Sequence, residues 1–431
     1  MELFNYIRER NWTTLLGYTL FIGMLSVGYY YNVTFIQLGL VDLGERLIGM
    51  SGRQVANNMA YLALITSATA LVTGLWMMKR GLSQKFVIKL RLAFAVILVQ
   101  TVLTAVAPNI GSETGFLAWV IIASLALGVG VPVTFGMTVD LIPRQDRGYV
   151  AAIITAVAYF AAPVLSAPWE IGNFSRQMLL IMVPGVPVLG LLAFKRFAFI
   201  ERLAQQHNKP EFWFGRYVRR DEAGCDRVSW KLFGLIILMF GVFFVDSLGF
   251  LRMTDTPFLM ESAWTSAELQ PRLFIGWVHV VAALVGGVLY STLPGRNLFY
   301  WIFGLFGLVH LMYTFPFRFG EPTAPALMMP MLYSTAVSLY TVVNFAIWAD
   351  VSTPRTISRN TALGVALSGW SATFISTALA IQWGAIGMPL DQHLRIVDSL
   401  AILFFLGMLV IAWLPGDRNR RLATGEKGRN A

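Results

Sequence analysis

The stretch VDLIPRQDRG, from Val139 to Gly148, places two acidic and two basic side chains between long apolar runs. A second stretch, ADVSTPRTISRN from Ala349 to Asn360, repeats much of this pattern. Asp350 stands in the place of Asp140, and the two are separated by close to half of the 431-residue chain. Because only 13% of the residues are charged, a charged break that recurs at this interval indicates a chain built from two related halves.

The composition on both sides of these breaks is that of a membrane protein. Apolar residues make up 56% of the chain and the mean hydropathy is +0.64, whereas soluble domains carry roughly 25% charged residues. A helix needs about 20 apolar residues to cross the hydrocarbon core of a bilayer. Twelve runs of about this length are present, at approximately 13–38, 55–78, 87–107, 116–138, 149–168, 178–199, 232–251, 273–293, 298–316, 325–348, 361–386 and 397–414. The expected fold class is therefore an all-α membrane protein with twelve transmembrane helices.

The distribution of basic residues predicts how these helices are oriented. If both termini face the cytoplasm, most of the 33 Lys and Arg residues fall in cytoplasmic segments, as the positive-inside rule requires. We therefore expect a multi-pass protein of the cytoplasmic (inner) membrane with both termini in the cytoplasm. The net charge of +10 then reflects contact with anionic lipid headgroups, and no nucleic-acid partner is expected.

Enzymatic classes find little support in the sequence. Cys225 is the only cysteine, so an intrachain disulfide and a cysteine-based metal site are excluded. The four histidines are scattered, acidic residues do not cluster with metal-ligand spacing, and no P-loop motif is present. We expect no catalytic residues, no metal and no cofactor.

A long polar interval divides the chain into its halves. The sequence predicts an N-terminal six-helix bundle over 1–199, a cytoplasmic linker over 200–231, a C-terminal six-helix bundle over 232–414 and a basic cytoplasmic tail over 415–431. Within the linker, Trp213, Tyr217 and Arg220 recur at helical spacing, which is typical of an amphipathic helix lying at the membrane interface. A solvated linker is the alternative.

This organisation resembles the major facilitator superfamily, and the loop GLWMMKRGLSQK carries the clearest local match. It keeps Gly74 and Gly81 seven residues apart, with Lys79 and Arg80 between them, while Met78 replaces the acidic residue of the family pattern. Family members consist of two six-helix bundles that alternately open a central site to either side of the membrane. The resemblance therefore implies the major facilitator fold and a transport function.

The repeated charged break can be interpreted within this resemblance. Asp140 and Asp350 lie at cytoplasmic helix ends, where the helix dipole disfavours an acid, so each should need a nearby cation such as Arg147 or Arg359. In the family, charged residues at these helix ends close the cytoplasmic side, which makes these four residues candidate gate residues. The alternative is that the charges only fix the ends of the helices.

Two ionisable residues inside the apolar runs are candidates for the transport pathway. An ionisable side chain within a membrane span is costly and indicates function by default. Asp246 and His279 lie at similar depths and could pair, which would suit a proton-coupled site. The alternatives are that Asp246 lies among the headgroups and that His279 packs between helices.

The resemblance also implies that the first, fourth, seventh and tenth helices line the central cavity. Polar residues on the first and tenth helices are Tyr30, Asn32, Tyr340 and Asn344. Of the three consecutive tyrosines Tyr29–Tyr31, not all can face the cavity, because neighbouring side chains are about 100° apart around a helix. Each asparagine could instead hold helices together through hydrogen bonds.

Taken together, these features predict a secondary active transporter that moves a small organic solute by alternating access. The aromatic residues of its helices favour an amphiphilic solute. Proton-coupled export is one form of this activity that the sequence allows, because AYFAAPVLSA at Ala158–Ala167 has small residues where antiporters of the family have glycines. The expected partners are a small-molecule substrate, the lipid bilayer and protons, with the protein acting as a monomer. The alternative is a transport-inactive membrane scaffold or assembly factor, which the loss of the acidic residue at Met78 would fit.

Overall fold

A computed structural model describes residues 2–166, 169–213, 215–218, 230–254, 264–293, 295–319 and 328–413. Within these ranges every regular element is a helix. Eleven helical spans there are long and apolar enough to cross a membrane. A further helix, α14 (Gly295–Phe319), contains a shorter apolar stretch, Asn297–Met312. The chain is therefore a multi-pass all-α membrane protein.

The long helices follow one another in chain order and several contain irregular turns. The first half contains α2 (Trp12–Tyr31), which continues through a π-helical segment (Asn32–Leu38), α3 (Gly39–Asp42) and a second π-helical segment (Leu43–Ile48), then α4 (Gly52–Lys79), α5 (Phe86–Val106), α6 (Glu113–Thr134) with α7 (Thr138–Leu141), α8 (Arg147–Leu165) and α9 (Ile171–Phe194). The second half contains α12 (Trp230–Thr254), α13 (Leu269–Thr292), α14, α15 (Met328–Asp350), α16 (Ile357–Thr361), a π-helical segment (Ala362–Ser371) continuing into α17 (Ala372–Ala385), and α18 (Leu390–Trp413). Short helices are α1 (Glu2–Arg8), α10 (Ala198–Ala204) and α11 (Pro210–Trp213).

Each of the twelve predicted apolar runs falls on one of these long helices, so the predicted fold class is confirmed. The first span is longer than predicted and ends at Ile48 instead of residue 38. Asp42 and Arg46 lie one turn apart and form an ion pair, with Nε and Oδ1 2.6 Å apart. This pairing lets the polar segment remain helical until Gly49, whose positive φ of 78° ends the helix.

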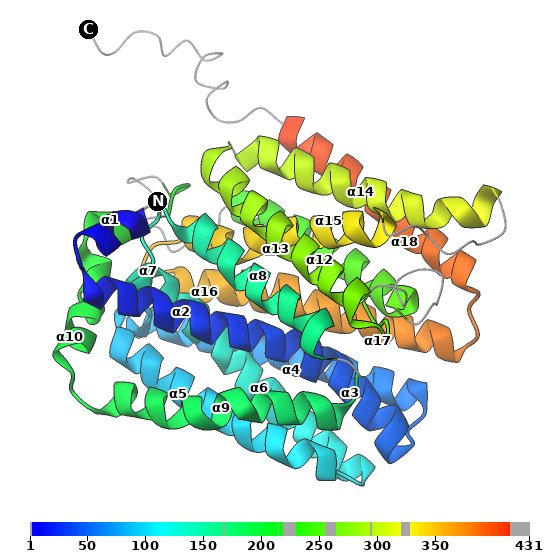
Figure 1. Cartoon of the computed structure of the whole chain (residues 1–431), viewed down its shortest axis with the longest axis horizontal. Helices are drawn as coiled ribbons and strands as arrows, with labels where there is room; N and C mark the ends of the chain where they lie inside the picture. The colour runs from blue at the N-terminus through cyan, green and yellow to red at the C-terminus, as the bar shows by residue number, and fades with distance from the viewer. Residues whose placement is uncertain are drawn as a thin grey trace, which may run out of the picture.

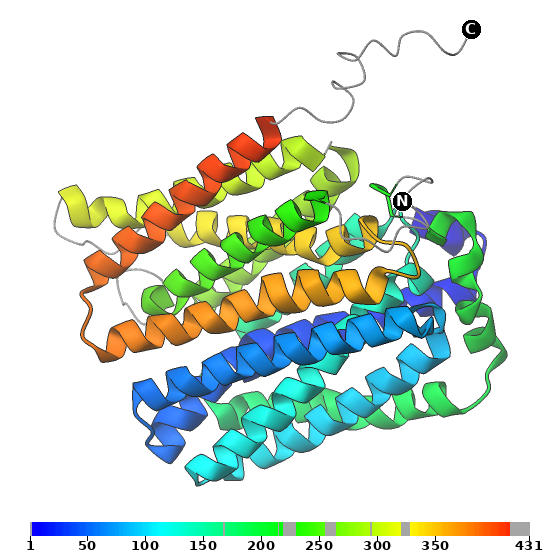
Figure 2. The ribbon, with the colours of Figure 1, turned by 180° about the vertical axis from the view of Figure 1, so that it is seen from behind.

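The two halves pack along paired helices. α8 packs along α13, and α4 packs along the segments from α16 to α17. Figure 1 shows α5, α6 and α9 on one side of the molecule and α14 and α18 on the other. Figure 2 shows α4 beside α17 over much of their length. The centre of the molecule, between these pairs, is therefore enclosed by helices of both halves.

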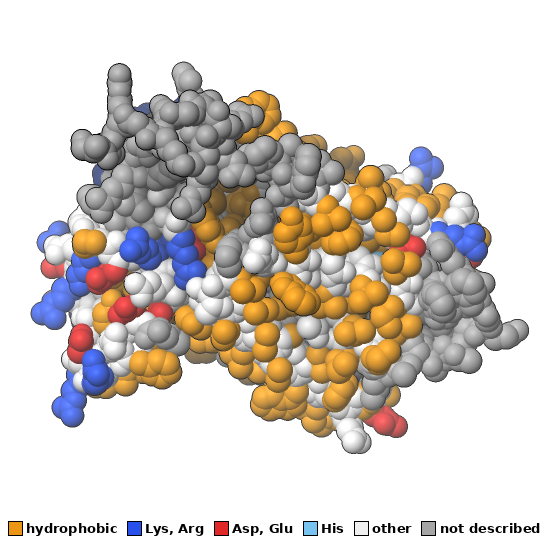
Figure 3. All heavy atoms as spheres, turned by 90° about the horizontal axis from the view of Figure 1, so that it is seen from above, with side chains coloured by type: hydrophobic (Ala, Val, Ile, Leu, Met, Phe, Trp, Pro, Cys, Tyr) orange, Lys and Arg blue, Asp and Glu red, His pale blue; other side chains and the backbone are white. Residues whose placement is uncertain are grey.

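The molecule has two distinct ends. We call the end formed by α1, 80–85, 142–146, 195–213 and 351–356 the basic end, and the end formed by 49–51, 110–112, 169–170 and 386–389 the opposite end. Figure 3 shows hydrophobic side chains over the middle of one face and charged side chains towards its ends, most densely at the basic end. This distribution fits helices that cross a bilayer from end to end.

In the described part of the linker, the chain is not helical at Tyr217, where the sequence suggested an interfacial helix. α11 ends at Trp213, and the Gly215–Val218 segment is not helical. Instead it lies along the end of α15, where the backbone N–H groups of Gly215 and Tyr217 donate to the carbonyl oxygens of Ser352 (3.1 Å) and Asp350 (2.9 Å). Arg220 and the predicted tail at 415–431 lie outside the described residues.

Candidate functional site

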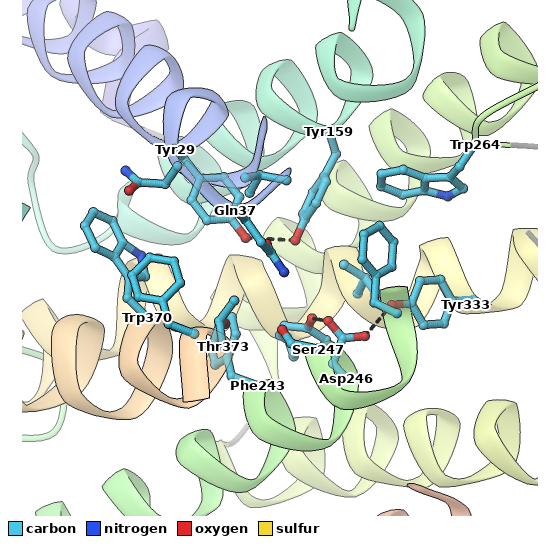
Figure 4. Close-up of a pocket in the computed structure, with 16 residues that line it drawn as sticks. Tyr29, Gln37, Tyr159, Phe243, Asp246, Ser247, Trp264, Tyr333, Trp370 and Thr373 are labelled. Carbon is cyan, nitrogen blue, oxygen red and sulfur yellow. Dashed lines mark hydrogen bonds between the residues drawn. The ribbon is translucent and has the colours of Figure 1, made fainter. Parts of the chain in front are cut away.

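A small cavity lies at the centre of the molecule, between the two halves. Its volume is about 50 Å³, which is room for ordered water but not for an organic solute. Nine of its sixteen lining residues are aromatic. Figure 4 shows these side chains converging from both halves. The lining comprises Tyr29, Asn32, Val33, Gln37, Tyr159, Phe243, Asp246, Ser247, Phe250, Trp264, Tyr333, Val337, Tyr340, Trp370, Thr373 and Phe374.

Asp246 is the one acidic residue in this lining. Its side chain comes from α12, and the residue is 8% exposed. The hydroxyl group of Tyr333 donates to its Oδ1 and that of Tyr340 to its Oδ2, and each donor–acceptor distance is 2.5 Å. Both tyrosines belong to α15, and a spacing of seven residues places them on the same face of that helix. The carboxylate is thus held by two neutral donors, one on each oxygen.

His279, on α13, does not pair with Asp246 as the sequence suggested. Its Nδ1 lies 2.8 Å from the hydroxyl of Ser338, and its ring stacks on Tyr159 with centroids 4.8 Å apart. Ser338 follows Tyr333 by five residues, which turns it about 140° around α15. The two ionisable side chains therefore contact different faces of one helix, and similar depth in the membrane did not bring them together.

Of the consecutive tyrosines, Tyr29 lines the cavity and the predicted Tyr30 does not. The Tyr29 hydroxyl lies 2.8 Å from that of Tyr159. The hydroxyl of Tyr30 points to the other side, where it bonds to Ser166 (2.9 Å) and donates to Oε1 of Gln177 (2.8 Å). Tyr30 therefore joins α2 to the region around α9, and the tyrosine that lines the cavity is Tyr29.

The two predicted asparagines have different surroundings. Asn32 lines the cavity at the start of a π-helical segment, and its Nδ2 donates to the carbonyl oxygen of Gly28 over 2.6 Å. Asn344 is not part of the lining, and its Oδ1 accepts a hydrogen bond from Nε1 of Trp348 (2.8 Å), one turn along α15. This contact stays within α15, and the place of Asn344 on the transport pathway stays a prediction.

Several lining residues were missed by the sequence analysis. Tyr159, Tyr333 and Trp264 were not predicted, although all three surround Asp246 or His279. The seven-residue spacing of Tyr333 and Tyr340 is visible in the sequence and could have identified the first of them. Trp264 lies between predicted helices, and nothing in its sequence context indicates that it packs against the cavity.

A larger hollow opens at the opposite end. This vestibule has a volume of about 510 Å³ and is lined by residues of the first span, the start of α4, α12 and α17, together with Trp169. Trp169 lines the vestibule and Phe250 lines the central cavity, and their rings stack with centroids 6.5 Å apart. One aromatic layer therefore separates the vestibule from the cavity at this point.

An ion pair joins the two halves at the basic end. Nη1 of Arg147, at the start of α8, lies 2.9 Å from Oδ1 of Asp350, at the end of α15, and both side chains are fully buried. The Tyr290 hydroxyl donates to Oδ2 of Asp350 (2.8 Å). Arg147 also donates to the carbonyl oxygens of Ala349 (3.0 Å) and Phe212 (3.2 Å). One guanidinium group thus links the first half, the second half and the linker.

Asp140 is neutralised differently. Its carboxylate forms a buried ion pair with Lys89 of α5, and the Lys89 ammonium also donates to the carbonyl oxygen of Gly136 (2.9 Å). Nδ1 of His207 lies 3.5 Å from the other carboxylate oxygen. The cation for Asp140 is therefore Lys89 and not Arg147 or Arg359, because α5 packs directly beside the end of α6. Arg359 donates through Nε to Oδ1 of Asn360 (3.0 Å).

Comparison with known proteins relies on structure alone, since no protein-family model and no curated protein sequence matches the chain. Solved structures do match. The proton:xylose symporter XylE bound to 6-bromo-6-deoxy-D-glucose superposes with a TM-score of 0.61 at 14% identity, covering 94% of this chain and 97% of the symporter. The chain has the major facilitator fold.

Two further solved structures agree. The human organic anion transporter MFSD10 gives a TM-score of 0.59 at 14% identity, over 92% of this chain and 98% of that chain. A bacterial homologue of the iron transporter ferroportin in an outward-facing state gives 0.58 at 15% identity, over 92% and 98%. At these identities the match shows the fold, and the three proteins differ in what their names say they carry.

In this major facilitator fold, a residue of the linker also contacts both halves at the basic end. Arg216 donates to the carbonyl oxygens of Arg144 (3.0 Å), Gln145 (3.0 Å) and Tyr290 (3.3 Å). Its Nε also lies 3.5 Å from Oδ2 of Asp350. The first two acceptors belong to the first half and the others to the second half. Arg216 therefore spans the interface beside the Arg147–Asp350 pair.

The beginning of the chain is fixed to the same end. Asp146 accepts hydrogen bonds from the backbone N–H groups of Glu2 (2.8 Å) and Leu3 (2.7 Å) and from the hydroxyl of Tyr18 (2.8 Å). The Tyr6 hydroxyl donates to Oε1 of Glu211 over 3.2 Å. Partial burial, with the Glu211 carboxylate nearby, raises the pKa of Tyr6, so this hydroxyl remains a neutral donor at neutral pH.

The loop that carried the family resemblance also belongs to the basic end. A side chain on Gly74 would place its Cβ 2.7 Å from the carbonyl oxygen of Ser358, so the close approach of α4 to α16 requires glycine. Gly81 has a φ of 65°, in the left-handed region that favours glycine. Lys79 and Arg80 are exposed at the end of α4. Among the described residues, no group of three or more His, Cys, Asp or Glu side chains could hold a metal ion.

Proposed function

We propose that the protein is a secondary active transporter that moves a small organic solute by alternating access. This proposal is supported by the structural difference between the two ends of the molecule. Arg147, Asp350 and Arg216 join the halves at the basic end, while a vestibule of about 510 Å³ opens at the opposite end. This is the arrangement expected of a transporter that is closed on one side and partly open on the other.

The chemistry of the central cavity supports an amphiphilic solute. Aromatic rings supply most of its lining, and Asn32, Gln37 and Asp246 add polar groups at its surface. A volume of about 50 Å³ is far below the 300–1,000 Å³ typical of ligand sites. Entry of a solute therefore requires the Trp169–Phe250 contact to separate, as it would when the opposite end opens fully.

We propose that a proton gradient, coupled through Asp246, supplies the energy for transport. We also propose that the solute is exported from the cytoplasm. A buried carboxylate can exchange a proton as the cavity opens to one side and then to the other. The basic end is the cytoplasmic end in this proposal, by the positive-inside rule. One of the similar structures is described as a proton symporter, which supports the plausibility of proton coupling within the fold.

Thiol labelling from both sides of the membrane tests alternating access. Val337 is small, buried and lines the cavity, and replacing Cys225 by serine leaves a chain free of cysteine. Val337→Cys in this background, reconstituted in vesicles, would be treated with a membrane-impermeant maleimide on either side. A transporter predicts labelling from both sides. Labelling from one side only, or from neither, would favour the scaffold alternative.

A matched cysteine separates alternation from general loosening of the helix bundle. Ser334→Cys lies on α15 three residues before Val337, is fully buried and is not part of the cavity lining. It should resist labelling from either side under conditions in which Val337→Cys reacts. Equal labelling of both positions would indicate an unfolded or loosened chain.

A further inference from the structure

We infer that the central cavity binds an organic cation, with the Asp246 carboxylate as its counter-charge and aromatic rings around its apolar body. This inference rests on the proposed transport function, because it names the class of solute for the same cavity. It goes beyond that function by specifying the charge of the solute, which the fold leaves open.

The charge of the lining is the first argument. Asp246 is its one charged side chain, and no Lys, Arg or His is among the sixteen lining residues. Its two hydrogen bonds come from neutral tyrosine hydroxyls, and no ion pair to Asp246 occurs within the described parts of the chain. Because a buried charge is stable only with an opposite charge nearby or after neutralisation, Asp246 must either bind a proton or face a cation, and in the proton-free state a cationic solute can supply that charge.

The aromatic rings are the second argument. A cation over an aromatic face within about 6 Å is attracted by the ring, most strongly for Trp and Tyr, and quaternary ammonium groups are recognised in this way. Tyr29 and Tyr159 line the cavity from the first half, and Phe243 and Trp370 line it from the second half. Figure 4 shows these four rings around the space next to Asp246. The rings can enclose an apolar cation on more than one side.

The lining also disfavours an anionic solute. The main alternative to an organic cation is a neutral solute. An anion next to Asp246 would meet a like charge in a site with no cationic side chain. A neutral polar solute could instead use Asn32, whose buried Oδ1 has no partner among the described residues, together with Gln37. A test must therefore compare a cation with an uncharged molecule of the same shape.

Benzyltrimethylammonium and neopentylbenzene form such a pair, because replacing the quaternary nitrogen by carbon removes the charge and keeps the shape. Binding of each to the purified full-length protein in detergent would be measured by ligand-dependent thermal stability, in which a ligand of the folded state raises the unfolding temperature. We expect saturable stabilisation by the cation and at least tenfold weaker binding of neopentylbenzene. Equal binding of both, or no saturable binding of the cation up to millimolar concentrations, would overturn the inference.

Substitutions assign the binding to this cavity. Asp246→Asn should weaken cation binding at least tenfold, whereas Asp246→Glu, which keeps the charge, should retain most of it. Trp370→Leu should weaken binding severalfold by removing a ring. Tyr30→Phe is the matched control, since Tyr30 points away from the cavity, and should bind like the unchanged protein. Cation binding that is equal in Asp246→Asn and the unchanged protein would overturn the inference.

The two proposals can fail separately. Cation binding in detergent does not require the protein to alternate, and labelling of Val337→Cys from both sides does not require a cation. Two-sided labelling without charge-dependent binding would keep the transporter and overturn the organic-cation inference. If Asp246→Asn does not fold, the comparison of the two probes on the unchanged protein still decides the charge of the solute.

Discussion

Asp140 and Asp350 occupy the same place in the repeated sequence, yet their carboxylates are neutralised in different ways. Both are fully buried at the basic end. Asp140 pairs with Lys89 inside the first half, while Asp350 pairs with Arg147 across the interface between the halves. The first copy of this sequence, at Asp140, therefore stabilises its own half. The second copy, at Asp350, contributes to the contact between the two halves.

The reason for the difference is visible in the neighbouring helices. α5 carries Lys89 beside Asp140. Among the described side chains, Asp350 is reached by guanidinium groups from the other half and from the linker, Arg147 and Arg216. A buried pair within one rigid bundle resists unfolding, whereas a pair between bundles resists their separation.

The largest effect is expected from Lys89→Met, which leaves the Asp140 carboxylate buried without its cation. Removing one partner of a buried ion pair costs about 3–5 kcal/mol, and this loss should appear in the free energy of unfolding measured by denaturant titration in detergent. The double variant Lys89→Met/Asp140→Leu should recover most of the loss. A loss below about 1 kcal/mol in the single variant would contradict the structural role of this pair.

Arg147→Met removes the corresponding cation from Asp350 but should act on the closure of the basic end. Truncating one partner of a buried charge pair across an interface costs about 2–5 kcal/mol, and separation of the halves lets water reach the remaining carboxylate. Val139 is buried at this interface near Ala349 and Ile357. In the Cys225→Ser background, maleimide labelling of Val139→Cys should become at least tenfold faster with Arg147→Met.

Lys89→Met is the matched control for that measurement. It breaks a buried ion pair of the same kind at the same end, but both of its partners belong to one half. Labelling of Val139→Cys should therefore change little under native conditions. If both variants accelerate labelling equally, the distinction between the two pairs is wrong.

Arg216→Ala should weaken closure by a smaller amount. The side chain donates to carbonyl oxygens on both halves, but it is 20% exposed and water can replace part of its contacts. We expect a loss of about 1–2 kcal/mol in the closure equilibrium, since hydrogen bonds from charged groups contribute about 1.5–3 kcal/mol when fully buried. Arg216→Lys should recover only part of it, because lysine lacks the planar fork that reaches several acceptors.

Tyr290→Phe is expected to give the smallest change. It removes one hydrogen bond to Asp350 and leaves the ion pair with Arg147 in place. A neutral donor contributes about 1 kcal/mol, so labelling of Val139→Cys should accelerate less than with Arg147→Met. An effect equal to that of Arg147→Met would show that the hydroxyl and not the guanidinium group holds the interface.

The sequence predicts the helices far better than it predicts their contacts. Apolar run length identified each long helix because spanning a bilayer demands it, and the cost of a buried acid singled out Asp246. The rotation of each helix cannot be determined from run length. Tyr29 faces the cavity in place of Tyr30 because α2 turns the second tyrosine towards α9, and this orientation depends on packing.

Pairing between helices was equally difficult to predict. Asp246 and His279 lie at similar depths, but α15 presents tyrosines to one and Ser338 to the other. The lysine that neutralises Asp140 is distant in sequence and becomes its neighbour only when α5 packs beside α6.

If the Arg147–Asp350 pair holds the two halves together at the basic end, breaking it should move them apart. Gln145 and Arg355 are exposed there, one on each half, and can carry spin labels as Gln145→Cys and Arg355→Cys in the Cys225→Ser background. The distance between the labels would be measured by double electron–electron resonance with arginine and with methionine at position 147. We predict a short distance with Arg147 and a shift to longer distances in Arg147→Met. An unchanged distance distribution in a folded Arg147→Met protein would contradict the account.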